Sequence, residues 1–217
     1  MASRVNWNQS TEELLNNNEN EVLKTFCKTI QYDKGLYTLA LPWKRNPEVL
    51  PTNYHIARGQ LASLYSKFVK NGSLHDKFKA ILNDYVTRDF IEIVDHDPSS
   101  GHFLPYHGVI KESVTTPVRI VFNASAKSGV ETVSLNDCLE TGPNLTEKLV
   151  TSLVRFRIGN FALMADISKA FLRIQVRVED RKYLKFLWIA DLEEPHVITT
   201  YQFKLVLFGC TSSPFLL

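Results

Sequence analysis

A single carboxylate ends an apolar stretch near the middle of the chain, in the sequence Phe161-Ala-Leu-Met-Ala-Asp166-Ile-Ser-Lys-Ala-Phe171. Magnesium binds oxygen ligands, usually one or two carboxylates completed by water and substrate phosphates. We expect the apolar residues to form a buried strand that delivers Asp166 to its end. Asp166 is therefore a candidate metal ligand for phosphoryl-transfer chemistry.

One carboxylate is too few for that chemistry to proceed through two metal ions. Two-metal transfer needs several carboxylates that hold the cations about 3.5–4 Å apart. No Asp-Asp pair occurs anywhere in the chain, so the sequence offers no obvious partner for Asp166. Without further context, an Asp after an apolar stretch is more often a turn or capping residue.

The charge distribution adds weak support for a polyanionic ligand. The chain has 217 residues, 44% of them hydrophobic and 22% charged, with a net charge of +2. Such a composition is typical of a globular protein. Between Arg155 and Lys185, however, eight basic residues face three acidic ones. This surplus is compatible with binding a phosphate backbone, and equally with an ordinary solvated face.

Several other classes of site lack their signatures. The three cysteines, Cys27, Cys138 and Cys210, are far apart, and the six histidines show no zinc-binding spacing. We therefore expect no zinc, no disulfide framework and a reducing, cytoplasmic setting. No apolar stretch approaches the length of a membrane span, so no membrane partner is expected. Motifs of serine hydrolases, P-loop NTPases and Rossmann folds are absent.

The N-terminal half predicts two helices between short strands. Residues 1–20 are polar and Asn-rich and predict a loose leader. Apolar spacing predicts a helix ending at Asn71-Gly72 and a second helix capped by Ser73. The remaining predicted elements are strands at 35–42, 90–94, 103–110 and 118–122, and a connector at 44–52.

The C-terminal half predicts alternating elements around Asp166. A helix is expected over 144–156, with Asn144 as its cap and Glu147 at the capping-box spacing. The strand carrying Asp166 follows, and further strands are expected over 172–178 and 199–205. Gly209 to Phe215 predicts a turn.

Four motifs in a fixed order resemble the reverse transcriptase of BEL/Pao-type LTR retrotransposons. They are Arg119-Ile-Val-Phe-Asn-Ala-Ser-Ala126, Ser134-Leu-Asn-Asp-Cys-Leu139, Ala165-Asp-Ile-Ser-Lys-Ala-Phe171 and Phe208-Gly-Cys-Thr-Ser-Ser-Pro-Phe215. The segment Gly101 to Ile110 is similar to the family's entry to the fingers. The resemblance covers about residues 53–217, and its strength lies in the order and spacing of the motifs together.

The resemblance implies roles for four residues at the catalytic centre. Asp166 matches the first catalytic aspartate, a ligand to Mg²⁺, and the backbone carbonyl of Ile167 is a possible extra ligand. Arg119 matches the fingers arginine that holds the triphosphate of a dNTP, for which guanidinium geometry is suited. Phe171 matches the steric gate that excludes a ribose 2′-hydroxyl. Lys111 or Lys127 is a candidate for a second phosphate contact.

The resemblance also implies a surface that positions the template–primer. Gly209, Ser213 and Pro214 match the loop and helix that back the template strand and the nascent base pair. For each of these residues an ordinary structural role remains the alternative.

Two departures from the family pattern limit what the resemblance implies. Asn123 stands where many relatives carry Asp, and the family's aromatic-x-Asp-Asp motif does not occur before the sequence ends at Leu217. We therefore expect the fingers and first part of the palm of an RNA-directed DNA polymerase, without the rest of the palm, the thumb and the RNase H region. The alternatives are a catalytically silent fragment and a host-adopted nucleic-acid-binding or interaction module.

The expected fold is α/β (α+β), with a mixed or antiparallel sheet and helices. By resemblance, residues 1–52 form a leader and connector, 53–138 and 172–208 the fingers-like region, and 139–171 and 209–217 the incomplete palm. In the parent enzyme a primer 3′-hydroxyl would attack the α-phosphate of a dNTP, assisted by two metal ions.

Overall fold

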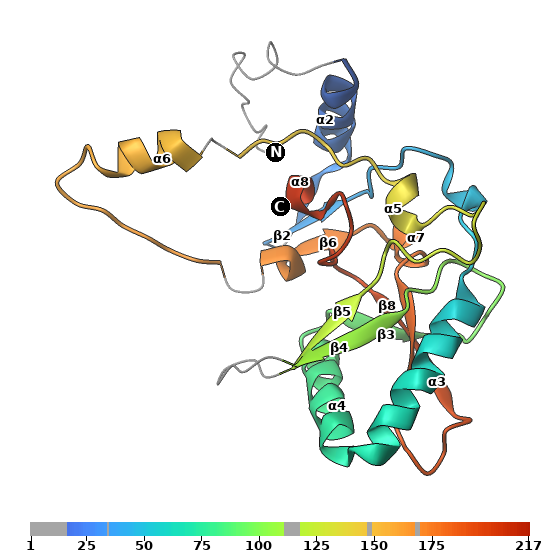
Figure 1. Cartoon of the computed structure of the whole chain (residues 1–217). Helices are drawn as coiled ribbons and strands as arrows, with labels where there is room; N and C mark the ends of the chain where they lie inside the picture. The colour runs from blue at the N-terminus through green and yellow to red at the C-terminus, as the bar shows by residue number, and fades with distance from the viewer. Residues whose placement is uncertain (1–16, 34, 111–117, 147–148, 168–169) are drawn as a thin grey trace.

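The computed structural model describes residues 17–33, 35–110, 118–146, 149–167 and 170–217. These residues form a mixed arrangement of helices and small sheets (Figure 1), which confirms the expected α+β class. None of the helices in this part of the chain is long and apolar enough to cross a membrane.

Two helices that meet at Asn71 form one side of the body. The predicted pair is present as α3 (Tyr54–Lys70) and α4 (Gly72–Thr87), which bury apolar faces that include Phe68 and Phe78. The predicted cap was wrong by two residues. Asn71, not Ser73, caps α4, because its side-chain oxygen accepts a hydrogen bond from the Leu74 amide at 3.2 Å.

The helices pack against a three-stranded antiparallel sheet in the order β3-β8-β7. Its strands are β3 (Ile91–Val94), β8 (Ile198–Phe203) and β7 (Lys185–Ile189). All five residues of β7 are buried, because α3 packs against the strand and the rings of Tyr106 and Phe122 contact Phe186. The segment 102–104 pairs with Lys185 at the start of β7. The predicted strands at 90–94 and 199–205 are thus confirmed to within two residues.

A β-hairpin lies beside this sheet and continues the core. It pairs β4 (Tyr106–Ile110) with β5 (Val118–Phe122), in the register Gly108 opposite Ile120. The Phe78 ring lies so close to Gly108 that an added Cβ would come within 2.6 Å of it. This contact explains how tightly α4 packs under the hairpin.

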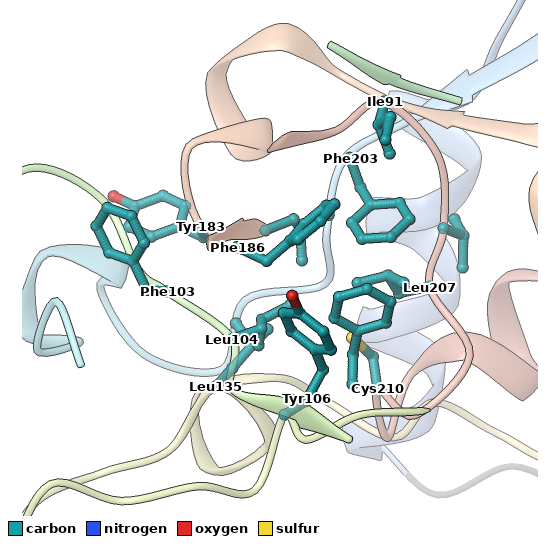
Figure 2. Close-up of a cluster of buried hydrophobic side chains, with 14 of the residues drawn as sticks. Ile91, Phe103, Leu104, Tyr106, Leu135, Tyr183, Phe186, Phe203, Leu207 and Cys210 are labelled. Carbon is teal, nitrogen blue, oxygen red and sulfur yellow. The ribbon is translucent and has the colours of Figure 1, made fainter. Parts of the chain in front are cut away.

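The aromatic centre of the body joins the hairpin to the sheet (Figure 2). Phe186 of β7 contacts the rings of Tyr106 and Phe122 from the hairpin and of Phe203 from β8, with centroids 5.0–5.8 Å apart. Each of these four side chains is at least 95% buried. Edge-to-face and tilted ring pairs of this kind add to the gain from burial.

A second sheet brings the N-terminal segment onto the C-terminal half. β1 (Gln31–Asp33) pairs with β2 (Leu36–Leu39), and β2 pairs in parallel with β6 (Ile174–Val176). The preceding helix α2 (Asn17–Thr29) begins inside the predicted leader, so the prediction of a loose chain up to residue 20 was wrong for its last four residues. Phe26 of α2 packs on Phe215, with ring centroids 5.1 Å apart.

The remaining elements are short. They are η1 (Pro47–Val49), α5 (Leu135–Cys138), η2 (Ala170–Arg173), α7 (Val178–Arg181) and α8 (Ser213–Leu216). The predicted strand at 172–178 shrinks to the three residues of β6, because η2 and α7 occupy its ends.

One segment, residues 149–167, leaves this body, and we call it the arm. It contains α6 (Leu149–Phe156) and an extended stretch, and Figure 1 shows it reaching away from the other elements. The strand expected over 161–166 is not formed: these residues are exposed and belong to no β-ladder of the described chain. The physical reason is that a strand requires a paired neighbour for its backbone groups.

Candidate nucleic-acid site

Asn136 of α5 joins three of the four motifs. Its side-chain amide donates to Ser125 Oγ at 2.8 Å and to the Gly209 carbonyl at 3.2 Å. Its side-chain oxygen accepts from the Thr211 amide at 2.8 Å, and its own amide donates to the Ala124 carbonyl. One side chain thus joins the segment after β5 to the turn before α8.

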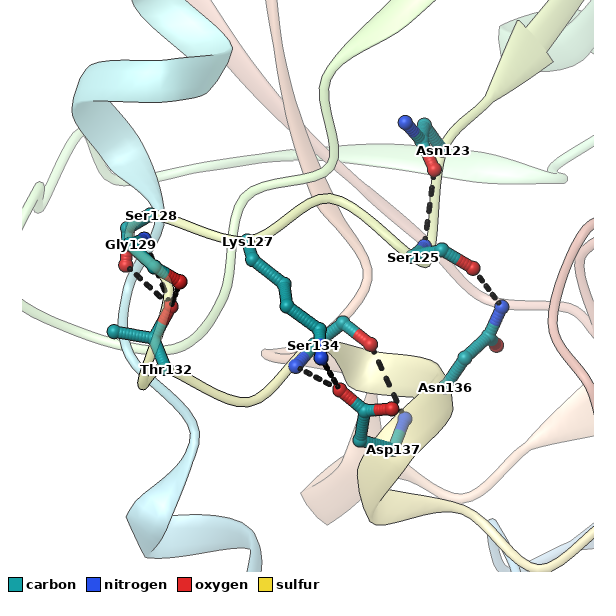
Figure 3. Close-up of polar contacts among 9 residues, drawn as sticks. All are labelled: Asn123, Ser125, Lys127, Ser128, Gly129, Thr132, Ser134, Asn136 and Asp137. Carbon is teal, nitrogen blue, oxygen red and sulfur yellow. Dashed lines mark hydrogen bonds and ion pairs between the residues drawn. The ribbon is translucent and has the colours of Figure 1, made fainter.

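The helix that presents Asn136 is fixed by a complete capping box (Figure 3). Ser134 Oγ accepts from the Asp137 amide, and the Asp137 carboxylate accepts from the Ser134 amide at 2.9 Å. Lys127 adds an ion pair to Asp137 at 2.8 Å. These bonds, led by the one from Lys127, lower the pKa of Asp137 to about 2.

Gly209 occupies a position in the turn that suits only glycine. Its φ is +111°, and an added Cβ would lie 2.9 Å from the carbonyl oxygen of Phe122. The left-handed conformation and the close backbone approach therefore both exclude a side chain. The turn before α8 packs directly against the end of β5.

The two other residues predicted to back the template differ in exposure. Ser213 is buried, and its hydroxyl donates to the Leu207 carbonyl, which holds the turn closed. Pro214 is the second residue of α8 and is exposed, while the next two residues, Phe215 and Leu216, are buried. Of this predicted surface, the residues that reach solvent are Gly209 and Pro214.

Arg119 lies on β5, three residues before the Phe122 carbonyl that Gly209 approaches. It is exposed and stands opposite Val109 in the hairpin. Lys127 forms an ion pair with Asp137, so a phosphate would have to compete with this carboxylate for its ammonium group. Lys111, the other candidate for that contact, lies outside the described residues.

The remaining motif, which carries Asp166, lies partly in the arm. Asp166 and Ile167 are exposed at the end of the arm. Phe171 belongs to η2, and its side chain lies outside the described part of the structure. Within the described ranges, no three His, Cys, Asp or Glu side chains are grouped so that they could hold a metal ion. One exposed carboxylate does not fit a two-metal centre.

Four of the eight basic residues between 155 and 185 are paired with carboxylates or buried within the fold. Arg177 bonds to Asp180 at 2.7 Å, Arg181 pairs with Glu92 at 3.4 Å, and Lys182 pairs with Glu48 at 3.3 Å. Lys185 is buried, and burial lowers the pKa of its ammonium group. Three of these four cations are thus paired with carboxylates and the fourth is buried, while binding of a phosphate backbone by the segment stays a prediction.

Asp180 is a key residue that the sequence did not single out. It is 2% exposed and accepts hydrogen bonds from the Leu41 amide, the Trp43 indole and the Arg177 guanidinium. It therefore anchors the chain after β2 to α7. The only local signal is an arginine three residues before it, since Leu41 and Trp43 are distant in sequence.

Comparison with known protein families and with curated proteins found no match to this chain.

Proposed function

We propose that this chain is part of a reverse transcriptase of the BEL/Pao type, comprising its fingers and the first part of its palm. For the chain by itself we propose template–primer binding as the function. The proposal rests first on the four motifs in their order, and then on one structural observation.

That observation is the junction at Asn136. Asn136 of α5 and Thr211 are 75 residues apart, yet the Asn136 side chain bonds both to the segment after β5 and to the turn before α8. Arg119 and the Gly209 turn both lie along β5, with Arg119 towards the hairpin loop and the turn beside Phe122 at the other end of the strand. An exposed arginine and a tight glycine turn are suited to receive a phosphate backbone.

The proposal contains no metal-dependent step for this chain. Asp166 is the one carboxylate that the resemblance assigns to a metal ion, and it lies in the arm. The polymerase reaction is therefore assigned to the parent enzyme. We expect no templated dNTP incorporation by the chain itself with Mg²⁺ or Mn²⁺. Incorporation that disappears in Asp166→Asn would contradict this expectation.

Fluorescence anisotropy with a labelled RNA–DNA primer–template tests the binding proposal. Arg119→Ala should weaken binding at least about threefold and reduce the salt slope by about one, as expected for one phosphate contact. Arg58→Ala is the charge-matched control, because Arg58 is also exposed but lies on α3. Equal effects of the two variants, or no binding at low salt, would overturn the proposal.

A second candidate is a host-adopted interaction module that keeps the fold without nucleic-acid binding. The pairing of Arg177, Arg181 and Lys182 with carboxylates favours it, because paired cations release fewer counterions. The coding sequence beyond Leu217 discriminates between the two candidates. An aromatic-x-Asp-Asp motif there would support the polymerase, and a stop codon or unrelated sequence would support the module.

A further inference from the structure

The arm exposes far more apolar surface than any other part of the described chain. Ten of the 23 exposed large hydrophobic side chains fall within these 19 residues. They are Leu149, Val150, Leu153, Val154, Phe156, Ile158, Phe161, Leu163, Met164 and Ile167. The exposed fractions run from 49% to 94%. Such a concentration marks an interaction surface, since isolated exposed hydrophobics are normal but contiguous ones are not.

The helix of the arm has a clear apolar side that no other element of the described chain covers. At 100° per residue, five apolar side chains of α6 fall on one half of the helix, while Thr151, Ser152 and Arg155 fall on the other half. None of the eight residues is buried. A helix this short is not stable on its own in water, so its apolar side requires a partner.

The extended half of the arm has the pattern of a strand without a neighbour. Phe161, Leu163 and Ala165 alternate with Ala162, Met164 and Asp166, so the backbone can present an apolar face on one side. In the described chain both edges of this segment lack a paired strand. An unpaired apolar edge of this kind is a template for another chain.

We propose that the arm binds the arm of a second copy of this chain. Ten side chains at roughly 100 Å² each give on the order of 1,000 Å² of apolar surface per copy. A stable protein interface needs about 800 Å² per partner, so the arm alone is sufficient. A like copy also supplies the matching helix and strand, which makes the contact closed and two-fold. This proposal does not depend on the polymerase assignment.

The charges on the arm favour an antiparallel pairing of the extended halves. A parallel, in-register pair would place Asp166 directly opposite its own copy, and like charges opposite one another destabilise a ladder. An antiparallel pair centred on Leu163 places Asp166 opposite Asn160 of the second copy, and Phe161 opposite Ala165. The carboxylate then faces a neutral amide, and the large ring faces a small side chain, which packs without a clash.

Sedimentation velocity of the full chain tests the proposal over about 1 to 100 μM. We expect a species of twice the chain mass whose share rises with concentration. Leu163→Asp should weaken association at least about tenfold, because it places two carboxylates at the two-fold axis. Val130→Asp is the control, since Val130 is fully exposed but lies outside the arm. A monomer at every concentration, or equal effects of the two variants, would overturn the proposal.

Cysteine cross-linking tests the register in a Cys27→Ser background, which removes the exposed native thiol. Leu163→Cys should form a covalent dimer under mild oxidation, because residues facing each other in an antiparallel pair lie within disulfide reach. Phe161→Cys should not, because the two copies of that residue would be four positions apart. Cross-linking of Phe161→Cys but not of Leu163→Cys would refute the register.

Discussion

The body and the arm are both rich in apolar residues, but the body buries them and the arm exposes them. In β7 all five residues are buried, with α3 and the β4–β5 hairpin packed against the strand. In the arm the apolar sequence Phe161-Ala-Leu-Met-Ala is exposed throughout. The difference lies in the neighbours, not in the residues. The alternation of residues in a strand indicates which face can be buried, but the face is buried only where a neighbouring element packs against it.

The largest expected contrast comes from one substitution made in both regions. Leu187→Ala in β7 should destabilise the protein by about 2–5 kcal/mol, because Leu187 is 1% exposed and its removal leaves a cavity. Leu163→Ala in the arm should change stability by less than about 0.5 kcal/mol, because Leu163 is 94% exposed. Urea unfolding of both variants, at a concentration where the chain is monomeric, measures the difference. Similar losses would show that the arm is part of the core.

A smaller effect is expected at the turn that joins the motifs. Gly209→Ala should cost about 1–3 kcal/mol, because its positive φ and the Phe122 carbonyl leave no room for a Cβ. Gly59→Ala is the matched control. Nothing lies within 4 Å of its Cβ position in α3, so the change should stabilise the helix by about 0.5–1 kcal/mol. Thermal unfolding of the two variants would therefore shift in opposite directions, and a neutral Gly209→Ala would show that the turn is not constrained.

The smallest expected effect is a pH dependence from His102. Its side chain is buried, with Nδ1 2.7 Å from the Pro51 carbonyl, and burial lowers the pKa of the imidazole below 6.5. Since the unfolded state then binds the proton more tightly, stability should be constant above pH 6.5 and fall as the pH drops towards the lowered pKa.

Urea midpoints between pH 8 and pH 5 check this expectation, the pH range being about that of a histidine titration. His102→Gln should reduce the slope of stability against pH, whereas His107→Gln should leave it unchanged because His107 is exposed. An unaltered slope in His102→Gln would assign the pH dependence to other groups.

Local patterns predicted the parts of the fold that depend on neighbouring residues. Apolar spacing was enough for α3 and α4, and the strands predicted at 103–110 and 118–122 are present as the hairpin, the first of them beginning at Tyr106. Residue type does not distinguish Ser73 from Asn71 as the cap of α4, because both serine and asparagine favour that position. The sequence alone does not show which of them has the geometry to bind the Leu74 amide.

The failures of sequence reasoning involve partners that are distant along the chain. Arg181 and Lys182 pair with Glu92 and Glu48, which are distant in sequence, so local patterns could not predict these ion pairs. Asp180 binds Leu41 and Trp43, so its anchoring role was equally hidden from local patterns. Asn136 lies within one of the four motifs, but nothing in the sequence shows that it joins three segments. The strand predicted over 161–166 is absent for a related reason, since no described residue pairs with this segment.

Hydrogen–deuterium exchange of the full chain tests the contrast between body and arm most directly. We predict that the amides of β7 and β8 exchange slowly at every concentration, because they are paired and buried. Amides 161–167 should exchange at unprotected rates in dilute solution and become protected as the chain self-associates. Slow exchange of 161–167 in the monomer would contradict the account, because it would show that the arm already has its partner within one chain.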